Sequence, residues 1–172
     1  MTATITSLTS VLLHAEPVAL RQRPRLSTTE IERANYDLEG ASPSEIVRWA
    51  RRTFGTRLVM TASFADTTLI DLAVNVDPDI EVVFLDTGFH FAETLNTVRR
   101  AMERYALNLT VLRPGGDAPD VWAAGSTACC DARKVAPLHL YLSDHADAWM
   151  SGVRRADDPG RAGAPIVSID KR

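Results

Sequence analysis

Two adjacent cysteines, Cys129 and Cys130, are the only thiols in this 172-residue chain. Neighbouring Cα atoms lie about 3.8 Å apart, less than the roughly 4.4–6.8 Å that a disulfide normally spans, so a bridge between them would be strained. Either the pair is two small buried side chains, because free cysteine packs as an apolar residue, or it presents two thiolates to one metal centre. Arg133 and Lys134 follow one helical turn later. Positive charge nearby favours the thiolate form, which supports the metal interpretation.

Two further stretches have the residue types that bind a nucleotide. In "TASFADTT", backbone amides and the hydroxyls of Ser63, Thr67 and Thr68 could hold a phosphate or sulfate, although the stretch lacks the Gly-Lys-Ser/Thr of a Walker loop. The alternative is a plain strand-to-helix turn capped by Asp66.

In "FLDTGFHFAET", Asp86 could accept hydrogen bonds from a ribose or a base, and Gly88 would let a ligand approach the backbone. The alternative is that Asp86 or Thr87 only caps the end of a strand. We expect His90 to be a surface or partly packed residue and not a metal ligand, because no second His or Cys stands at ligand spacing from it.

A third stretch, "SGVRRADDPGR", concentrates arginine. Arg154, Arg155 and Arg161 could converge on an anionic group, since guanidinium forks suit phosphate and sulfate. Asp157 and Asp158 could equally be their partners in a solvated surface cluster.

Helix and strand signals place these stretches in an α/β fold with a mostly parallel sheet and helices on both of its faces. Three apolar runs predict strands buried on both faces, and the helical stretches between them imply right-handed crossovers. Ligands of such folds bind at the carboxyl ends of the strands, where the three polar stretches lie. Ser42 and Glu45 predict a capping box, with Pro43 in the first turn of a helix that ends at Gly55. The expected helices cover 27–40, 43–54, 66–76, 92–105 and 133–145, and the expected strands cover 57–63, 80–86, 107–114, 148–153 and 164–169.

The composition is that of an ordinary globular domain, with 45% hydrophobic and 24% charged residues. A net charge of −3 gives no pull towards nucleic acid, and no apolar run approaches the ~20 residues of a membrane span, so we expect neither a nucleic-acid nor a membrane partner. Residues 1–26 are predicted to form an N-terminal arm and residues 27–172 one domain. Unbridged cysteines without a secretory signal predict the cytoplasm.

With these stretches in view, the chain resembles the assimilatory sulfonucleotide reductases, the family of adenylyl-sulfate and phosphoadenylyl-sulfate reductases. The resemblance is carried, in the family's order, by "TASFADTTLIDLA", "VFLDTGFHFAETLNTVRR", "CCDARKVAPL" and "WMSGVRRADDPGRAGAPIVSID". It implies an adenine-nucleotide α-hydrolase-like fold. It also implies thioredoxin-dependent reduction of adenylyl sulfate to sulfite and AMP, a step of sulfate assimilation towards cysteine.

The resemblance also assigns roles to residues. The vicinal pair Cys129 and Cys130 would ligate a [4Fe–4S] cluster and would mark the subgroup that prefers adenylyl sulfate to its 3′-phosphorylated form. In this family a cysteine on a C-terminal tail attacks the sulfate sulfur, AMP leaves, and thioredoxin releases sulfite from the resulting thiosulfonate. The substrate-binding residues implied are Ser63, Phe64, Asp66, Asp86, Thr87, Gly88, Arg133, Lys134, Gly152, Arg154, Arg155 and Arg161.

The sequence departs from the family pattern after its arginine block. The later Cys-x-x-Cys pair and the tail nucleophile are absent from these 172 residues, which offer two of the four thiolates that an all-cysteine cluster needs. We therefore expect a truncated reductase with impaired activity and no catalytic residue of its own. The alternatives are an inactive nucleotide-binding remnant, or an adenylating enzyme of the same fold. The latter is disfavoured by the missing Ser-Gly-Gly-x-Asp-Ser loop.

Overall fold

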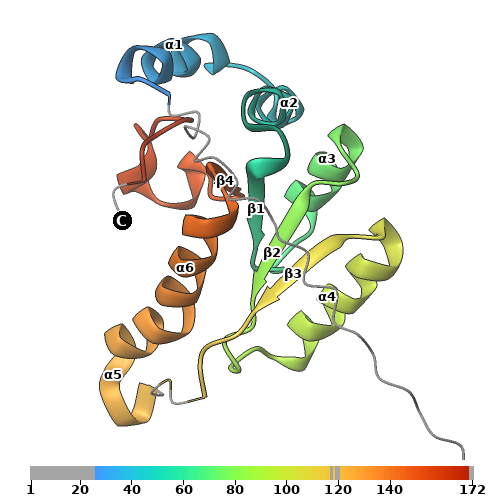
Figure 1. Cartoon of the computed structure of the whole chain (residues 1–172), viewed down its shortest axis with the longest axis vertical. Coiled ribbons are helices and arrows are strands. Elements are labelled where there is room, and N and C mark those ends of the chain that lie inside the picture. The colour runs from blue at the N-terminus through green and yellow to red at the C-terminus, as the bar shows by residue number, and fades with distance from the viewer. Residues whose placement is uncertain (1–25, 117, 119–120, 171–172) are drawn as a thin grey trace, which may run out of the picture.

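A computed structural model describes residues 26–116, 118 and 121–170 of the chain. Its four strands form one parallel sheet in the order β3-β2-β1-β4, with helices on both faces (Figure 1), which confirms the predicted α/β class. The predicted N-terminal arm lies outside the described residues, apart from residue 26. The elements are α1 (Thr28–Leu38), α2 (Pro43–Phe54), η1 (Gly55–Arg57), β1 (Leu58–Ala62), α3 (Thr68–Val76), β2 (Glu81–Leu85), α4 (Ala92–Tyr105), β3 (Asn108–Leu112), α5 (Val121–Cys130), η2 (Asp131–Val135), α6 (Ala136–His145), β4 (Ala148–Ser151), η3 (Arg155–Asp157) and η4 (Pro159–Arg161).

Capping residues fix the starts of the first two helices. Ser27 forms a capping box with Glu30 at the start of α1, and Ser42 forms one with Glu45 at the start of α2. Pro43 occupies the first turn of α2, as predicted. A good N-cap stabilises a helix by about 1 kcal/mol, so both boundaries follow from local sequence alone.

The larger part of the core lies where α2, α3 and α4 cover one face of the sheet. Alternate strand residues such as Met60 and Val82 point into it, and Val98 and Ala101 of α4 pack onto them. Leu95 and Met102 of the same helix are 43% and 46% exposed and do not contribute to this core. The turn of α4 that faces the sheet is set instead by Val98 and Ala101.

The opposite face of the sheet is covered by α6. Val59 and Val83, each one residue along from the inward-facing residues of the first face, pack here against Tyr141, Leu142 and Ala146. Strands β1 and β2 are therefore buried on both faces, as predicted. The prediction was wrong for β3, which is an edge strand with only partly buried or exposed residues.

The predicted helix 133–145 is the last part of a longer helical run. This longer run begins with α5, which we did not predict from the sequence. The helical geometry of α5 is interrupted at Gly125, where φ is 81°. The π-helical segment η2 then leads directly into α6. π-turns inside helices often occur at functional sites, and this one follows the cysteine pair without a gap.

The predicted strand 164–169 does not form. The side chain of Asn35 in α1 donates to the Val167 carbonyl oxygen at 2.8 Å and accepts from the Val167 amide at 2.9 Å. Both backbone groups that a neighbouring strand would bind are thus taken by one side-chain amide. Figure 1 shows α1 beside this C-terminal segment. None of the helices among the described residues has the length and apolar character to cross a bilayer.

Candidate functional site

The loop between β1 and α3 is anchored by a buried aromatic ring. Phe64 has a left-handed backbone with φ of 56°, which costs an ordinary residue roughly 1–2 kcal/mol. Its ring is only 2% exposed and packs edge-on against Phe84, with ring centroids 5.3 Å apart. Burying such a ring contributes about 1.5–3 kcal/mol, so packing offsets the strain. The neighbouring Ser63 and Ala65 are therefore presented at the surface, where a ligand can reach them.

The N-cap of α3 is Thr67, which makes no side-chain cap hydrogen bond, and Asp66 instead binds the first amide of the helix from the position before the cap. Its carboxylate accepts from the Thr68 amide at 2.9 Å in the first turn of α3. The hydroxyl of Ser63 accepts from the Ala65 amide at 3.4 Å. The loop is thus internally bonded without a ligand, and it keeps the Ser63 hydroxyl at the carboxyl end of β1.

The turn after β2 is held by the Asp86 carboxylate. Asp86 accepts from the Gly88 amide at 3.2 Å and from Nε of Arg113 at 3.1 Å. A carboxylate has about four lone-pair sites, so these two hydrogen bonds do not use its full acceptor capacity. Gly88 has φ of 81°, a conformation that favours glycine. His90 is half-buried, with Nε2 2.8 Å from the Leu85 carbonyl oxygen, as expected for a packed residue.

Arg133 joins this turn to the helical run that carries the cysteines. Its guanidinium donates to the carbonyl oxygens of Thr87, at 3.0 Å, and Ala118, at 2.8 Å. It also lies over the Phe89 ring, 4.8 Å from the centroid. The residue that we expected to assist the thiolates and the substrate therefore also holds two distant loops together. Lys134, next to it, is exposed.

The two cysteines differ in their surroundings. Cys129 is buried, Cys130 is exposed, and both are free thiols. The interpretation as a buried apolar pair is therefore wrong for Cys130. Successive helical residues point about 100° apart, so one side chain enters the core while the other faces solvent.

The segment after β4 begins close to helix α3. A Cβ added at Gly152 would be 3.8 Å from Leu69 of α3. Arg154 pairs with Asp157 at 2.8 Å, and this hydrogen bond, the charge of Asp157 and a smaller contribution from the charge of Asp66 raise the pKa of Arg154. Arg154 is thus part of the surface cluster that we considered, and the charge of Asp66 in the β1–α3 loop also acts on it.

The three arginines do not converge in this structure. Arg155 forms a fork with Glu39, the C-cap residue of α1, whereas Arg154 pairs with Asp157. Arg161 is exposed. Sequence reasoning missed both Glu39 and Arg113. Arg113 lies at the carboxyl end of the predicted strand 107–114, where ligands of such folds bind, and that position signals it, but no local signal identifies Glu39.

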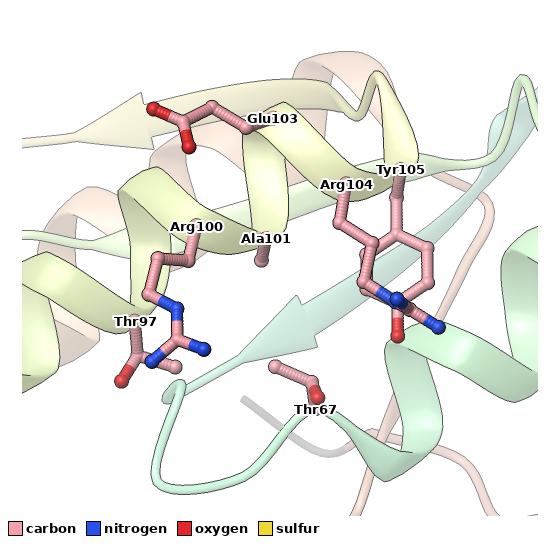
Figure 2. A pocket seen from close by; sticks show the side chains of 7 residues that line it. All are labelled: Thr67, Thr97, Arg100, Ala101, Glu103, Arg104 and Tyr105. Carbon is pink, nitrogen blue, oxygen red and sulfur yellow. The ribbon is translucent and has the colours of Figure 1, made fainter.

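The described part of the chain also contains a hollow of about 550 Å³ between the start of α3 and α4 (Figure 2). Arg100 and Arg104 point into it, and Glu103 points away. Its lining residues are Thr67, Thr97, Arg100, Ala101, Glu103, Arg104 and Tyr105. None of the predicted substrate-binding residues is among them, so we do not assign this hollow to the substrate.

Comparison with known proteins identifies the family. A model of the phosphoadenosine phosphosulfate reductase domain matches residues 57–172, which include the four sequence blocks quoted above. The chain belongs to this reductase domain family.

Named relatives of this reductase domain agree with that assignment. The chain is 38% identical to adenosine 5′-phosphosulfate reductase of Mycobacteroides abscessus over 81% of its own length and 62% of that protein. It is 37% identical to the protein of the same name from Halalkalibacterium halodurans, over 83% of its own length and 66% of that protein. The chain thus spans just under two thirds of the length of these relatives.

A solved structure supports the fold of the reductase domain. Phosphoadenylyl-sulfate reductase from Candida auris, solved as a phosphate complex, superimposes with a TM-score of 0.71 and 24% identity. The match covers 86% of this chain and 75% of that one. The layered arrangement of parallel strands and helices is therefore shared with a reductase of this family.

The donor set of the reductase domain can be tested against an iron–sulfur cluster. An all-cysteine cluster needs four thiolates, and the sequence contains two. Within the residues that the structure describes, no group of three or more His, Cys, Asp or Glu side chains is placed to hold a metal ion. These residues do not make up a cluster site by themselves.

Proposed function

We propose that this chain is the nucleotide-binding part of a reductase that converts adenylyl sulfate to sulfite and AMP. The observation that carries the proposal is the bridge made by Arg133. It connects the helix of Cys129 and Cys130 to the Thr87–Gly88 turn at the carboxyl end of β2. A nucleotide bound at this edge of the sheet would therefore lie next to the cysteine pair. The names of the curated relatives support the same substrate.

In this proposal each loop binds a different part of adenylyl sulfate. Asp86 and Gly88 receive the ribose or the base, using the remaining acceptor capacity of the carboxylate. The β1–α3 loop, with Ser63 at the carboxyl end of β1, receives the phosphate. The charge of Asp66 in this loop already acts on Arg154, and in this proposal Arg154 neutralises the phosphosulfate charge. Lys134, Gly152 and Arg161 stay predicted contacts to the same ligand.

The reduction adds two electrons to the sulfate sulfur. A thiolate attacks that sulfur, the bond from sulfur to the phosphate oxygen of AMP breaks, and AMP leaves with that electron pair. A second thiol then attacks the thiosulfonate, a disulfide forms, and sulfite leaves. In the family the first thiolate comes from a tail cysteine and the second thiol from thioredoxin, which we propose as the partner. The residues of this chain bind and orient the nucleotide for these steps.

We also propose that Cys129 and Cys130 supply two of the ligands of a [4Fe–4S] cluster. A cluster of this kind binds thiolates, and the pair stands on one helix beside the proposed substrate site. The other two ligands do not come from cysteines of these 172 residues, so we derive no step from the cluster. The proposed location is the cytoplasm, where free thiols persist.

Calorimetry of wild-type protein and Arg154→Ala with adenylyl sulfate and with AMP tests the proposal. Wild type should bind both, and Arg154→Ala should weaken the binding of adenylyl sulfate by about tenfold or more, because a charge-assisted contact is lost. Arg52→Ala is the matched control. Arg52 is an exposed residue of α2, near the end of the sheet opposite the proposed site, and its removal should not change the affinity. Equal affinity of wild type and Arg154→Ala would remove this arginine from the site, and failure of wild type to bind either nucleotide would overturn the proposed function.

A further inference from the structure

We infer that helix α1 positions the arginine segment of the site. In this inference Arg155 attaches the segment to α1 and does not contact the anionic ligand. The α1 clasp consists of Asn35 in α1 and Glu39, the C-cap residue of that helix, and of Arg155 and Val167 on the C-terminal segment. The ligand-binding consequence rests on the proposed function, whereas the mechanical consequence can be measured without any ligand.

The first half of the clasp uses the donor groups of Arg155. Its two terminal nitrogens donate to the two carboxylate oxygens of Glu39, at 2.7 and 2.9 Å. Its Nε donates to the Ala164 carbonyl oxygen at 2.8 Å. The hydrogen bond from Arg155, followed by its charge, holds the pKa of Glu39 below its usual value. Two parallel hydrogen bonds of this kind fix the orientation of the guanidinium relative to the carboxylate as well as their separation. All three nitrogens of the guanidinium therefore donate a hydrogen bond.

The second half of the clasp is Asn35. Its side-chain amide accepts a hydrogen bond from the Val167 amide and donates one to the Val167 carbonyl oxygen. It also donates to the Ile31 carbonyl oxygen, one turn earlier in α1, at 3.0 Å. This third bond orients the side-chain amide on the helix, so that its two ends match the two backbone groups of Val167. The segment from Arg155 to Val167 is therefore fixed to α1 near both of its ends.

The backbone of the segment separates the two neighbouring arginines. Arg154 has an extended conformation, with φ of −112° and ψ of 155°. Successive side chains in extended backbone point in opposite directions. Arg155 pairs with Glu39, whereas Arg154 pairs with Asp157. Fixing Arg155 to Glu39 therefore fixes the backbone that carries Arg154, the ligand contact of the proposed function, which gives Glu39 and Arg155 one shared positioning role.

A double-mutant cycle distinguishes a positioning role from a ligand contact. Affinity for adenylyl sulfate is measured for Glu39→Ala, Arg155→Ala and the double variant. If the clasp positions the segment, each single variant should lose affinity by the same factor, about three- to tenfold, and the double variant should lose no more. If Arg155 contacted the ligand, Glu39→Ala would leave the affinity unchanged or raise it, while Arg155→Ala would lower it. That second pattern would overturn the inference.

Glu32→Ala is the matched control. Glu32 is exposed on α1, seven residues before Glu39 and thus two helical turns away. Its removal changes the charge of the helix equally but leaves the clasp intact, so the affinity should equal that of wild type. A loss as large as that of Glu39→Ala would point to the charge of α1 and not to the clasp, and would contradict the inference.

Hydrogen exchange tests the clasp in the protein without nucleotide. Asn35→Ala should accelerate exchange of the Val167 amide by about tenfold or more, since its acceptor is lost, and Glu39→Ala should accelerate exchange across 155–167. Unchanged exchange in both variants would overturn the clasp whatever the affinities are. If wild type bound neither nucleotide, the proposed function would fail, and this measurement alone would still decide the mechanical inference.

Discussion

The guanidinium of Arg133 lies 3.0 Å from the carbonyl oxygen of Thr87, although the two residues are 46 positions apart in the chain. A second bond, to the Ala118 carbonyl oxygen, makes this side chain a connection between the turn after β2 and the segment before α5. Arg133 is thus part of the "CCDARKVAPL" block in the sequence, and its side chain holds the turn of the "FLDTGF" block in the structure.

Replacing Arg133 should therefore reduce stability as well as nucleotide binding. Arg133→Ala leaves two carbonyl oxygens without a charged donor, and we expect the free energy of unfolding to fall by roughly 1.5–3 kcal/mol in urea titrations. Lys134→Ala removes the same charge from the next, exposed position and should change stability by less than about 0.5 kcal/mol. Equal losses in the two variants would mean that net charge, not the Thr87 contact, is responsible.

Phe64 should anchor the β1–α3 loop. Phe64→Ala removes a buried ring, and we expect a loss of about 3–5 kcal/mol in the free energy of unfolding together with weaker AMP binding. Phe91→Ala, at a ring that is 79% exposed, is the control and should be close to neutral. A small effect of Phe64→Ala on both measurements would show that the strained backbone holds the loop without its ring.

The Asp77 carboxylate should make stability depend on acid pH. Its hydrogen bond from the Asp79 amide, at 2.9 Å, is the largest cause of the lowered pKa of Asp77, and Arg51 adds to the shift against the opposing effect of burial. A folded pKa below the ordinary value of 3.8 means that the stabilisation is complete above about that pH and is lost as pH falls through the folded pKa.

Asp77→Asn should accordingly cost about 1 kcal/mol at pH 7, and the difference from wild type should vanish under strongly acidic conditions. Urea titrations between pH 2 and pH 7 measure this difference in the free energy of unfolding. That pH range covers the pKa values that aspartates usually have in proteins. A constant difference at every pH would indicate lost packing instead of a titrating charge.

Iron binding should be weak in this chain. Two thiolates cannot complete a four-thiolate site, so protein reconstituted anaerobically should hold substoichiometric and labile iron. Cys129→Ser should abolish what binds. Four tightly held irons per chain with a cluster-like visible spectrum would contradict this, and would mean that ligands come from another chain or from other residue types.

The 172-residue chain should also make no sulfite above background from adenylyl sulfate and reduced thioredoxin. Its two thiols are proposed cluster ligands, Cys129 is buried, and an attacking thiol must be accessible. Fusing a relative's C-terminal segment should restore turnover if the nucleotide site is intact. Sulfite release by the unextended chain that disappears in Cys130→Ser would instead make the exposed cysteine catalytic.

The sequence predicts features whose causes are local. Ser42 and Glu45 lie three residues apart, and their capping box forms because the partners meet within one turn. The strands β1 and β2 were predictable because an unbroken apolar run suits burial on both faces. The class of the fold follows from these elements and from their alternation.

The rest depends on contacts between distant residues. The apolar content of 164–169 favoured a strand, but Asn35 takes the backbone groups of Val167, and nothing near either residue signals that contact. The composition of the arginine block likewise suggested convergence on an anion, and only the position of Glu39 at the C-cap of α1 reveals why Arg155 turns elsewhere.

The attachment of α1 also sets an order of events on the ribosome. Asn35 is synthesised 132 residues before Val167, its hydrogen-bonding partner. At about 5–20 residues per second, roughly 7–26 s pass before the partner emerges, and during this time the helix has no C-terminal segment to bind. The last described residues to leave the ribosome therefore fasten the first helix, so the domain can complete its native packing only when translation of this region has finished.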